Sequence, residues 1–327
     1  MVVTPHVDIA SYSDLEALAT QRTAEGWLRT ETLLRAILAW DKGRIFLVRA
    51  GELDPAADDP RAPIATTSAI AAGPVGIIGN VITRADYRRR GLGHAVMEGA
   101  LTWLRTSGVR SVLLDATEDG RPLYTRLGFA GVAPSWFGYA PLATIDRDML
   151  ARIAGDRRAA LAEKQALARV SALDIAAFGG ARSDFLALLL AMPRHWLYIA
   201  EDATGAPAGY ALVRLLDAPY VGVRVGSWVA RDRATAAALL VALLAADAPW
   251  RREMSTGSLE PQMFISLPGT SHDALSLFAA AGGTLVEDDL IMRLDFDASA
   301  RGMDGETRTP LAEHPDWIYS WVAPMVF

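Results

Sequence analysis

The feature that most constrains the fold of this chain is a weak internal repeat with a long period. In the 327-residue sequence, HWLYIAED (195–202) can be laid over RIFLVRAG (44–51), and VGSWVARDRATAAALLVALLAAD (225–247) over the segment that begins IGNVITRADYRRRGLG (78–93). A period of this length is typical of a duplicated domain, not of a solenoid. We therefore predict two domains, residues 1–145 and 146–300, followed by a C-terminal extension, 301–327. Each domain is long enough for its own core.

Helical and strand patterns in the first copy predict an α+β fold. Residues 13–40 have a helical period interrupted near Gly26, and residues 44–50, 63–72 and 75–84 read as strands. Apolar alternation breaks at Gly79 and Asn80, which indicates a bulge in the third strand. Four elements follow along the chain: a helix from Leu92 to Gly108, a buried strand SVLLDA, a short helix GRPLYTRLGF, and a strand FAGVAPSWFGYAPL that returns to the sheet.

A polar helical connector, TIDRDMLARIAGDRRAALAEK (144–164), marks the expected boundary between the copies. The longest small-apolar run, residues 234–250, is shorter than the roughly 20 residues that a bilayer requires. The N-terminus lacks the basic and apolar regions of a secretory signal. We expect a cytoplasmic protein that does not contact a membrane.

The composition excludes several chemistries. The chain has no cysteine, which removes thiolate metal sites and a cysteine acyl-enzyme. Its five histidines show no ligand spacing, so we expect no metal. The net charge of −6 argues against a general nucleic-acid binder, and the arginines at residues 88–90 are therefore a local feature.

Those three arginines precede Gly91-Leu92-Gly93 at the start of a predicted helix. A helix N-terminus is already positive, so each cation there costs about 0.3–1 kcal/mol unless an anion compensates it. A strand, a glycine turn and a helix together form an anion-binding geometry. A dinucleotide fingerprint would need Gly or Ala where Val96 stands, and a phosphate loop would need Gly-Lys-Ser/Thr, so neither fits.

The segment Arg88-Arg89-Arg90-Gly91-Leu92-Gly93 instead resembles the Arg/Gln-x-x-Gly-x-Gly/Ala motif of the GNAT superfamily of acyl-CoA-dependent N-acyltransferases. LYTRLGF (123–129) resembles the Leu-Tyr-x-x-x-Gly-Phe of the same family, and AEGW (24–27) the Gly-Trp of a subgroup with a second, degenerate domain. The resemblance covers residues 1–145. It implies two GNAT-like domains, each a mixed, mostly antiparallel twisted sheet flanked by helices.

In that family the glycine turn holds the pyrophosphate of coenzyme A, and the backbone of the bulged strand stabilises the oxyanion and pairs with the pantetheine arm. Thr117 stands where the family often has an Asn that contacts this arm. The cofactor-binding residues expected from the resemblance are Val81, Ile82, Thr83, Arg88, Arg89, Arg90, Gly91, Leu92, Gly93, His94 and Thr117.

Tyr124 is the expected catalytic acid, because a phenol can donate a proton to the departing thiolate. The amine needs a base or a water relay, for which Asp115, Glu118, Glu25 or bulk water remain candidates. Trp27, Glu25 and Asp115 are the candidate acceptor residues. Trp136, Phe137 and Tyr139 could line an acceptor pocket or belong to the core, and we favour the core.

The second copy lacks both the arginine cluster and Gly-x-Gly, and Phe278 falls where Tyr124 stands. We therefore expect residues 1–145 to be catalytic and residues 146–300 to be degenerate. The predicted activity is direct acyl transfer from acetyl-CoA, or another acyl-CoA, to a primary amine of a small molecule in a ternary complex. Protein-lysine acetylation and a CoA-binding sensor or scaffold without turnover are the alternatives, and a homodimer is possible.

Overall fold

The computed structural model describes residues 5–25, 31–216, 220–255, 259–297 and 311–320. The described chain forms two compact units. Unit 1 contains residues 5–130 and 292–297, and unit 2 contains residues 131–291 and 311–320, apart from the gaps given above.

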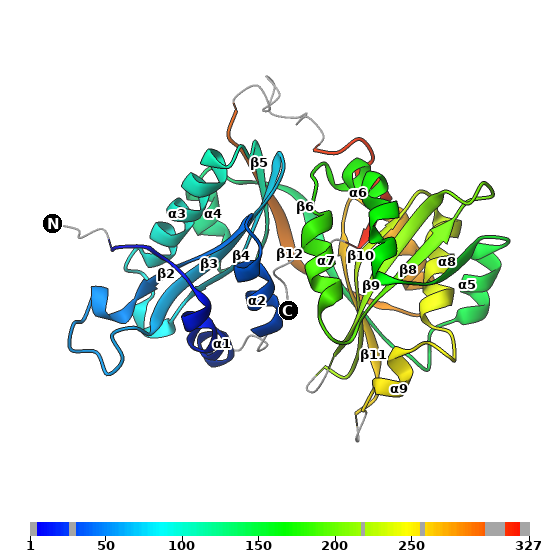
Figure 1. Ribbon diagram of the computed structural model, residues 1–327, viewed down its shortest axis with the longest axis horizontal. Coiled ribbons are helices and arrows are strands. Elements are labelled where there is room, and N and C mark those ends of the chain that lie inside the picture. The colour runs from blue at the N-terminus through cyan, green and yellow to red at the C-terminus, as the bar shows by residue number, and fades with distance from the viewer. Residues whose placement is uncertain (1–4, 26–30, 217–219, 256–258, 298–310, 321–327) are drawn as a thin grey trace. The chain divides into compact units, whose positions relative to one another are not determined.

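Unit 1 is built on a mixed sheet. Its strands, in sheet order, are β1 (Asp8–Ile9), β2 (Gly43–Arg49), β3 (Pro63–Ala72), β4 (Val75–Thr83), β5 (Ser111–Ala116) and the end of β12 (Thr284–Asp295). The first four strands are antiparallel, and β4 and β5 are parallel. Helices α1 (Leu15–Ala24) and α2 (Glu31–Ala39) cover one face, and α3 (Leu92–Thr106) and α4 (Arg121–Arg126) lie on the other (Figure 1).

Unit 2 repeats this plan. Its strands are β6 (Ala130–Pro141), β7 (Arg158–Ala162), β8 (His195–Glu201), β9 (Pro207–Leu216), β10 (Gly222–Ala230), β11 (Gln262–Pro268), the first part of β12, and β13 (Ile318–Ser320). Its helices are α5 (Arg147–Ala154), α6 (Ser171–Phe178), α7 (Ser183–Ala191), α8 (Arg233–Leu243), α9 (Trp250–Glu253) and α10 (His272–Ala280). Apolar side chains of α5, α8 and α10 pack with those of β8–β11 into one core. The predicted α+β class and the duplication are confirmed.

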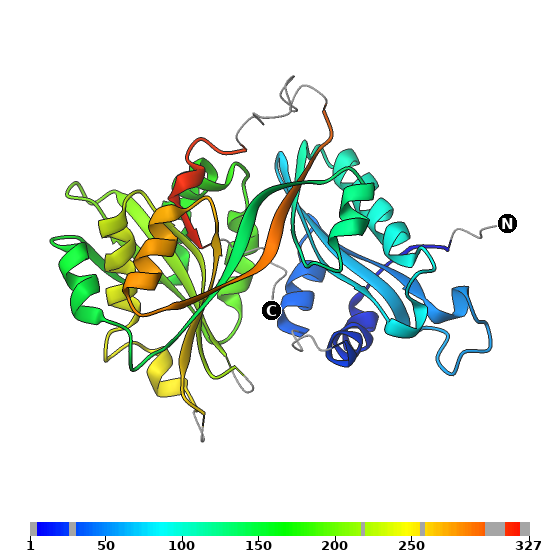
Figure 2. The ribbon, with the colours of Figure 1, turned by 180° about the vertical axis from the view of Figure 1, so that it is seen from behind.

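The sheet neighbours of β6 lie far from it in the sequence. Strand β6 does not pair with β5; it lies between β12 and β11 in the strand order and pairs with β11 from Gln262↔Pro141 to Pro268↔Ser135. Figure 2 shows β6 (green) and β12 (orange) side by side. The compact units therefore change at 130/131 and 291/292, whereas the functional boundaries at 145/146 and 300/301 stay a prediction.

The end of β12 completes unit 1 through a buried polar cluster. Ser111 Oγ on β5 donates to Asp295 Oδ1 at 2.5 Å, and Arg293 Nε donates to the same oxygen at 2.6 Å. All three side chains are buried. Because buried charges are costly unless paired and hydrogen-bonded, this cluster defines how the last strand of unit 1 is seated.

The predicted connector belongs to the fold of unit 2. It forms α5 and β7, and Leu150 on α5 is fully buried in the core of that unit. Polar residues dominate its sequence because the opposite face of an amphipathic helix is solvated. None of the helices in the described part of the chain is long and apolar enough to cross a bilayer.

The predicted bulge in β4 is confirmed. Ser68 pairs with Gly79 and Thr66 pairs with Ile82, so Asn80 and Val81 oppose one residue of β3. Asn80 has a φ of 53°, and its buried amide donates to Ser68 Oγ at 2.6 Å and accepts from Arg22. These contacts hold a backbone conformation that L-residues disfavour. Burial lowers the pKa of Arg22 to about 10.

Candidate functional site

Unit 1 contains a cavity of about 880 Å³ that gathers most of the predicted site. Three segments form most of its wall, namely the end of β4, the turn that leads into α3, and the segment around α4, and Glu25 at the end of α1 completes it. Its lining residues are Glu25, Val81, Ile82, Thr83, Arg88, Arg89, Gly91, Leu92, Gly93, His94, Thr117, Asp119, Gly120, Leu123, Tyr124 and Arg126. Of the predicted residues that the structure describes, Arg90 and the candidate carboxylates Asp115 and Glu118 are not part of this wall.

The first wall is a strand edge that parts from its neighbour. β4 and β5 pair at Val75↔Ser111, Gly76↔Val112 and Ile77↔Leu113, and their pairing ends there although β4 runs on to Thr83. On its other side β4 still pairs with β3, at Thr66↔Ile82 and Ala65↔Thr83. The backbone at Val81–Thr83 therefore presents one edge to the cavity, where its polar groups are available to a ligand.

The second wall is the glycine turn. Gly91 caps the N-terminus of α3 with a φ of 80°, and a Cβ there would meet nothing within 4 Å. Arg89 also lies in the left-handed region, with a φ of 62°. The first turn of α3 contains no acidic residue. Its leading N–H groups and its dipole thus face the cavity without an internal anion.

The three arginines have different surroundings. Arg88 donates from Nη2 to Glu25 Oε2 at 2.7 Å and from Nε to the carbonyl of Thr83 at 3.1 Å. Arg89 lines the cavity. Arg90 donates to the carbonyl of Asp86 at 3.1 Å and lies 5.1 Å from the centre of the Tyr87 ring. Arg88 and Arg89 therefore place two cations on the cavity wall, whereas Arg90 supports the turn.

The candidate base and acceptor residues are dispersed. Glu25 is on the cavity wall, where its carboxylate also accepts from the backbone N–H of Ala85 at 3.1 Å. Asp115 is half-buried on β5, and Glu118 is exposed; neither lines the cavity. Trp27 lies outside the described residues. Glu25 is thus the one described member of this group on the wall, and its carboxylate is already engaged.

The third wall carries Tyr124 on the short helix α4. Its ring is 6% exposed and contacts Phe129 edge-on at 6.2 Å between ring centres. Gly120 leaves room for it, since a Cβ there would lie 2.7 Å from Tyr124 Cε2. The hydroxyl of Thr117 is 3.3 Å from the N–H of Gly120. The ring is consequently fixed by packing at the cavity wall.

Four lining residues escaped the sequence analysis: Asp119, Gly120, Leu123 and Arg126. They lie within five residues of Tyr124 in the sequence. Their closeness to Tyr124 in the sequence could have identified them, because residues three or four positions apart lie on the same face of a helix.

The described residues of unit 2 do not repeat this arrangement at the corresponding helix, α8. Asp232 caps α8, and its carboxylate accepts from the N–H of Thr235 at 2.7 Å. Arg157 donates to the same carboxylate at 3.1 Å. A carboxylate of the chain itself therefore occupies the positive end of α8. Phe278, the counterpart of Tyr124, is fully buried in the core.

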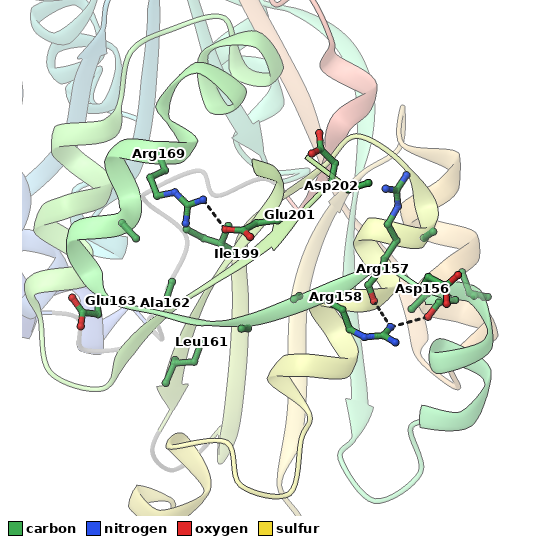
Figure 3. A pocket seen from close by; sticks show the side chains of 18 residues that line it. Asp156, Arg157, Arg158, Leu161, Ala162, Glu163, Arg169, Ile199, Glu201 and Asp202 are labelled. Carbon is green, nitrogen blue, oxygen red and sulfur yellow. Dashed lines mark hydrogen bonds and ion pairs between the residues drawn. The ribbon is translucent and has the colours of Figure 1, made fainter. Parts of the chain in front are cut away.

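Unit 2 has another hollow of about 950 Å³, which runs along β7 (Figure 3). Its charged lining is largely engaged within the protein. Arg169 donates to Glu201 at 2.6 Å, and Arg158 donates to the carbonyls of Gly155 and Arg157 at 3.0 and 3.1 Å. It contains neither a glycine turn at a long helix nor a tyrosine. Volume alone does not make it the functional site.

Comparison with known proteins agrees with this geometry. Residues 12–129 match the model of the acetyltransferase (GNAT) family, and residues 170–298 match an acetyltransferase (GNAT) domain. The chain belongs to the GNAT acetyltransferase family and contains two such domains.

The relatives are distant. The chain is 31% identical over 137 residues to the uncharacterized N-acetyltransferase YitH of Bacillus subtilis, a match that spans 41% of this chain and 45% of that protein. A putative acetyltransferase of Pyrococcus horikoshii has the same fold over 98% of this chain and 95% of its own, with a TM-score of 0.71 and 18% identity. A tandem GNAT protein from the clavulanic acid biosynthesis pathway covers 89% and 98%, with a TM-score of 0.61 and 16% identity.

Proposed function

We propose that unit 1 transfers an acetyl group from acetyl-CoA directly to a primary amine of a small molecule. The observation that carries this proposal is one cavity with three features: the edge of β4 at Val81–Thr83, the glycine turn before α3, and the buried ring of Tyr124. The turn suits a diphosphate, the strand edge suits the amides of a pantetheine arm, and the tyrosine suits the leaving sulfur.

In the proposed reaction the neutral amine nitrogen attacks the thioester carbon. A C–N bond forms and gives a tetrahedral oxyanion, which backbone N–H groups of the Val81–Thr83 edge stabilise. The oxyanion collapses and the C–S bond breaks. The leaving sulfur takes the proton of the Tyr124 hydroxyl, and the ammonium proton passes to water, from which the tyrosine recovers its own.

The engaged carboxylate of Glu25 favours water as the acceptor of the amine proton. That carboxylate accepts from Arg88 Nη2 at 2.7 Å and from the N–H of Ala85 at 3.1 Å, so both of its oxygens are already hydrogen-bonded. The lack of cysteine in the chain fits a ternary complex without an acyl-enzyme. This proposal includes the primary-amine acceptor, the catalytic role of the first domain and a cytoplasmic location.

The test is release of free CoA thiol from acetyl-CoA with a panel of small primary amines and with lysine peptides. We expect turnover with small amines, and a 10- to 100-fold lower kcat in Tyr124→Phe with an unchanged KM for acetyl-CoA. Tyr87→Phe is the matched control, because Tyr87 contacts Arg84 and Arg90 outside the cavity wall. Turnover of lysine peptides alone would identify a protein-lysine acetyltransferase. Tight CoA binding without turnover on any acceptor would identify a sensor.

A further inference from the structure

The sheet of unit 2 also opens between two parallel strands. β10 and β11 pair from Gly222↔Gln262 to Val225↔Ile265, and the pairing stops there although β10 continues to Ala230. The bulge of β4 recurs at this point: Ser227 has a φ of 46°, and the register with β9 shifts between Gly226 and Trp228. In unit 2, β10 therefore separates from its parallel neighbour after a bulge, as β4 does beside the cavity of unit 1.

The edge of β10 beyond the bulge is occupied by β13. Trp228 pairs with Ser320, and Val229 pairs with Ile318, in antiparallel orientation. The other edge of the same residues is taken by β9, through Trp228↔Ala211 and Val229↔Tyr210. β13 must therefore lie on the β11 side, inside the opening, where the red segment is seen next to β10 (Figure 1).

Ser320 is seated where the two strands part. Its hydroxyl donates to the carbonyl of Ser266 on β11 at 2.8 Å and lies 3.2 Å from the carbonyl of Val225 on β10. Its side chain is fully buried, and that of Ile318 is 8% exposed. The buried hydroxyl of Ser320 is thus satisfied within the opening, as burial requires.

The residues before β13 are anchored on the same unit. The N–H of His314 donates to the carbonyl of Ala176 on α6 at 2.8 Å, and Trp317 lies 5.6 Å from the guanidinium of Arg231. A Cβ on Gly179 would lie 1.9 Å from the carbonyl oxygen of Leu311, so the chain passes directly over the end of α6. The segment is attached along its length.

The two bulge residues give the correspondence between the units. If Ser227 matches Asn80, then Trp228 and Val229 match Val81 and Ile82, and the partners Tyr210 and Thr66 match as well. β13 therefore lies along the edge that corresponds to the cofactor edge of unit 1.

We propose that the opening of unit 2 is a binding site for an extended peptide strand, and that its ligand in this chain is the segment 318–320. Main-chain pairing gives such a site its affinity, and the buried positions of Ile318 and Ser320 give it specificity. A second consequence rests on the proposed function of unit 1: with β13 in place, unit 2 does not take an acyl-CoA, and the chain binds one CoA.

Two measurements on the unmodified full chain test this proposal. In hydrogen exchange, the amides of residues 228 and 229 and of residues 318–320 should exchange slowly and together, as members of one ladder. Exchange of residues 318–320 at the rate of an unpaired peptide would overturn the proposal. Native mass spectrometry with CoA should give one CoA per chain. Two would overturn the closure of unit 2, whereas none would count against the proposed function and leave the exchange result as the test of the strand site.

Ile318→Asp provides a separate test, because a buried carboxylate disfavours the pairing. Exchange at residues 228 and 229, which pair with β13, should become at least about tenfold faster. A synthetic peptide of residues 311–320 added in excess should restore the slow exchange. The same peptide with aspartate at position 318 should not. Asp316→Ala, an exposed position of the same segment, is the matched control and should exchange as the unmodified chain does. Failure of the unaltered peptide to restore protection to a folded variant would overturn the proposal.

Discussion

Glu25 and Arg88 form an ion pair of 2.7 Å on the wall of the unit 1 cavity. They are 63 residues apart in the sequence, one at the end of α1 and the other in the glycine turn before α3. The pair links a helix of one sheet face to the turn that we assign to the diphosphate. A carboxylate at this position could act as a general base or could support Arg88, and the ion pair favours the support of Arg88.

We expect Glu25→Gln to retain kcat within about threefold at saturating acetyl-CoA, because its amide oxygen can still accept from Arg88, although the bond from the N–H of Ala85 is lost. A general base would contribute about 10²–10⁴-fold, and its removal would be seen in kcat. The measurement is kcat across the pH range with one good amine. Asp119→Asn, a second acid of the same wall, is the control. A hundredfold drop confined to Glu25→Gln would assign the base role to Glu25.

Gly91 and Gly108 form a matched pair for testing the turn. They have φ values of 80° and 81°, and a Cβ at either would meet nothing within 4 Å. We expect Gly91→Ala and Gly108→Ala each to lower the free energy of unfolding by about 1 kcal/mol, since both need the left-handed region. Only Gly91→Asp should abolish CoA binding in calorimetry, because it places a carboxylate at the phosphate position. Equal CoA affinity in Gly91→Asp and Gly108→Asp would contradict the assigned turn.

Arg89 and Arg90 are adjacent, but only Arg89 lines the cavity. We expect Arg89→Ala to weaken CoA binding about tenfold and to reduce its salt dependence, because one charge-assisted contact is lost. Arg90→Ala should change the affinity by less than about threefold, since Arg90 contacts Tyr87 and Asp86. Calorimetric titrations at two salt concentrations check both values. The reverse order would place the diphosphate on the other side of the turn.

His195 on β8 predicts a pH dependence of stability in unit 2. Burial lowers its pKa to about 4, helped by Arg214 and Lys164 and opposed by the carbonyl of Pro193, 2.8 Å from Nδ1. Its folded pKa is below the unfolded value of about 6.5, so its contribution is complete above pH 6.5 and is lost as the pH falls towards 4. The loss is on the order of 1–3 kcal/mol. Thermal unfolding across this range should show a smaller decline in His195→Gln, and an equal decline would contradict the assignment.

Local chemistry explains why much of the site could be predicted. The glycine turn, the bulge at Asn80 and the tyrosine of α4 each depend on residues within one short segment, where side-chain size and backbone preference decide the conformation. The strands read from residues 63–72 and 111–116 have those bounds in the structure. The sequence could not show that Arg90 lies off the cavity wall, because three adjacent arginines differ only in the residues that surround them in the folded protein.

The sequence by itself determined that the chain contains two copies of one α+β unit, and that one copy has a glycine turn before a helix followed by a tyrosine. Only the tertiary structure decided that β6 pairs with β11, that the end of β12 completes the sheet of unit 1, and that Arg88 pairs with Glu25. It also placed residues 318–320 beside β10. The physical reason is that strand pairing and ion pairs join residues far apart in the chain, and their free energy depends on the packing around both partners.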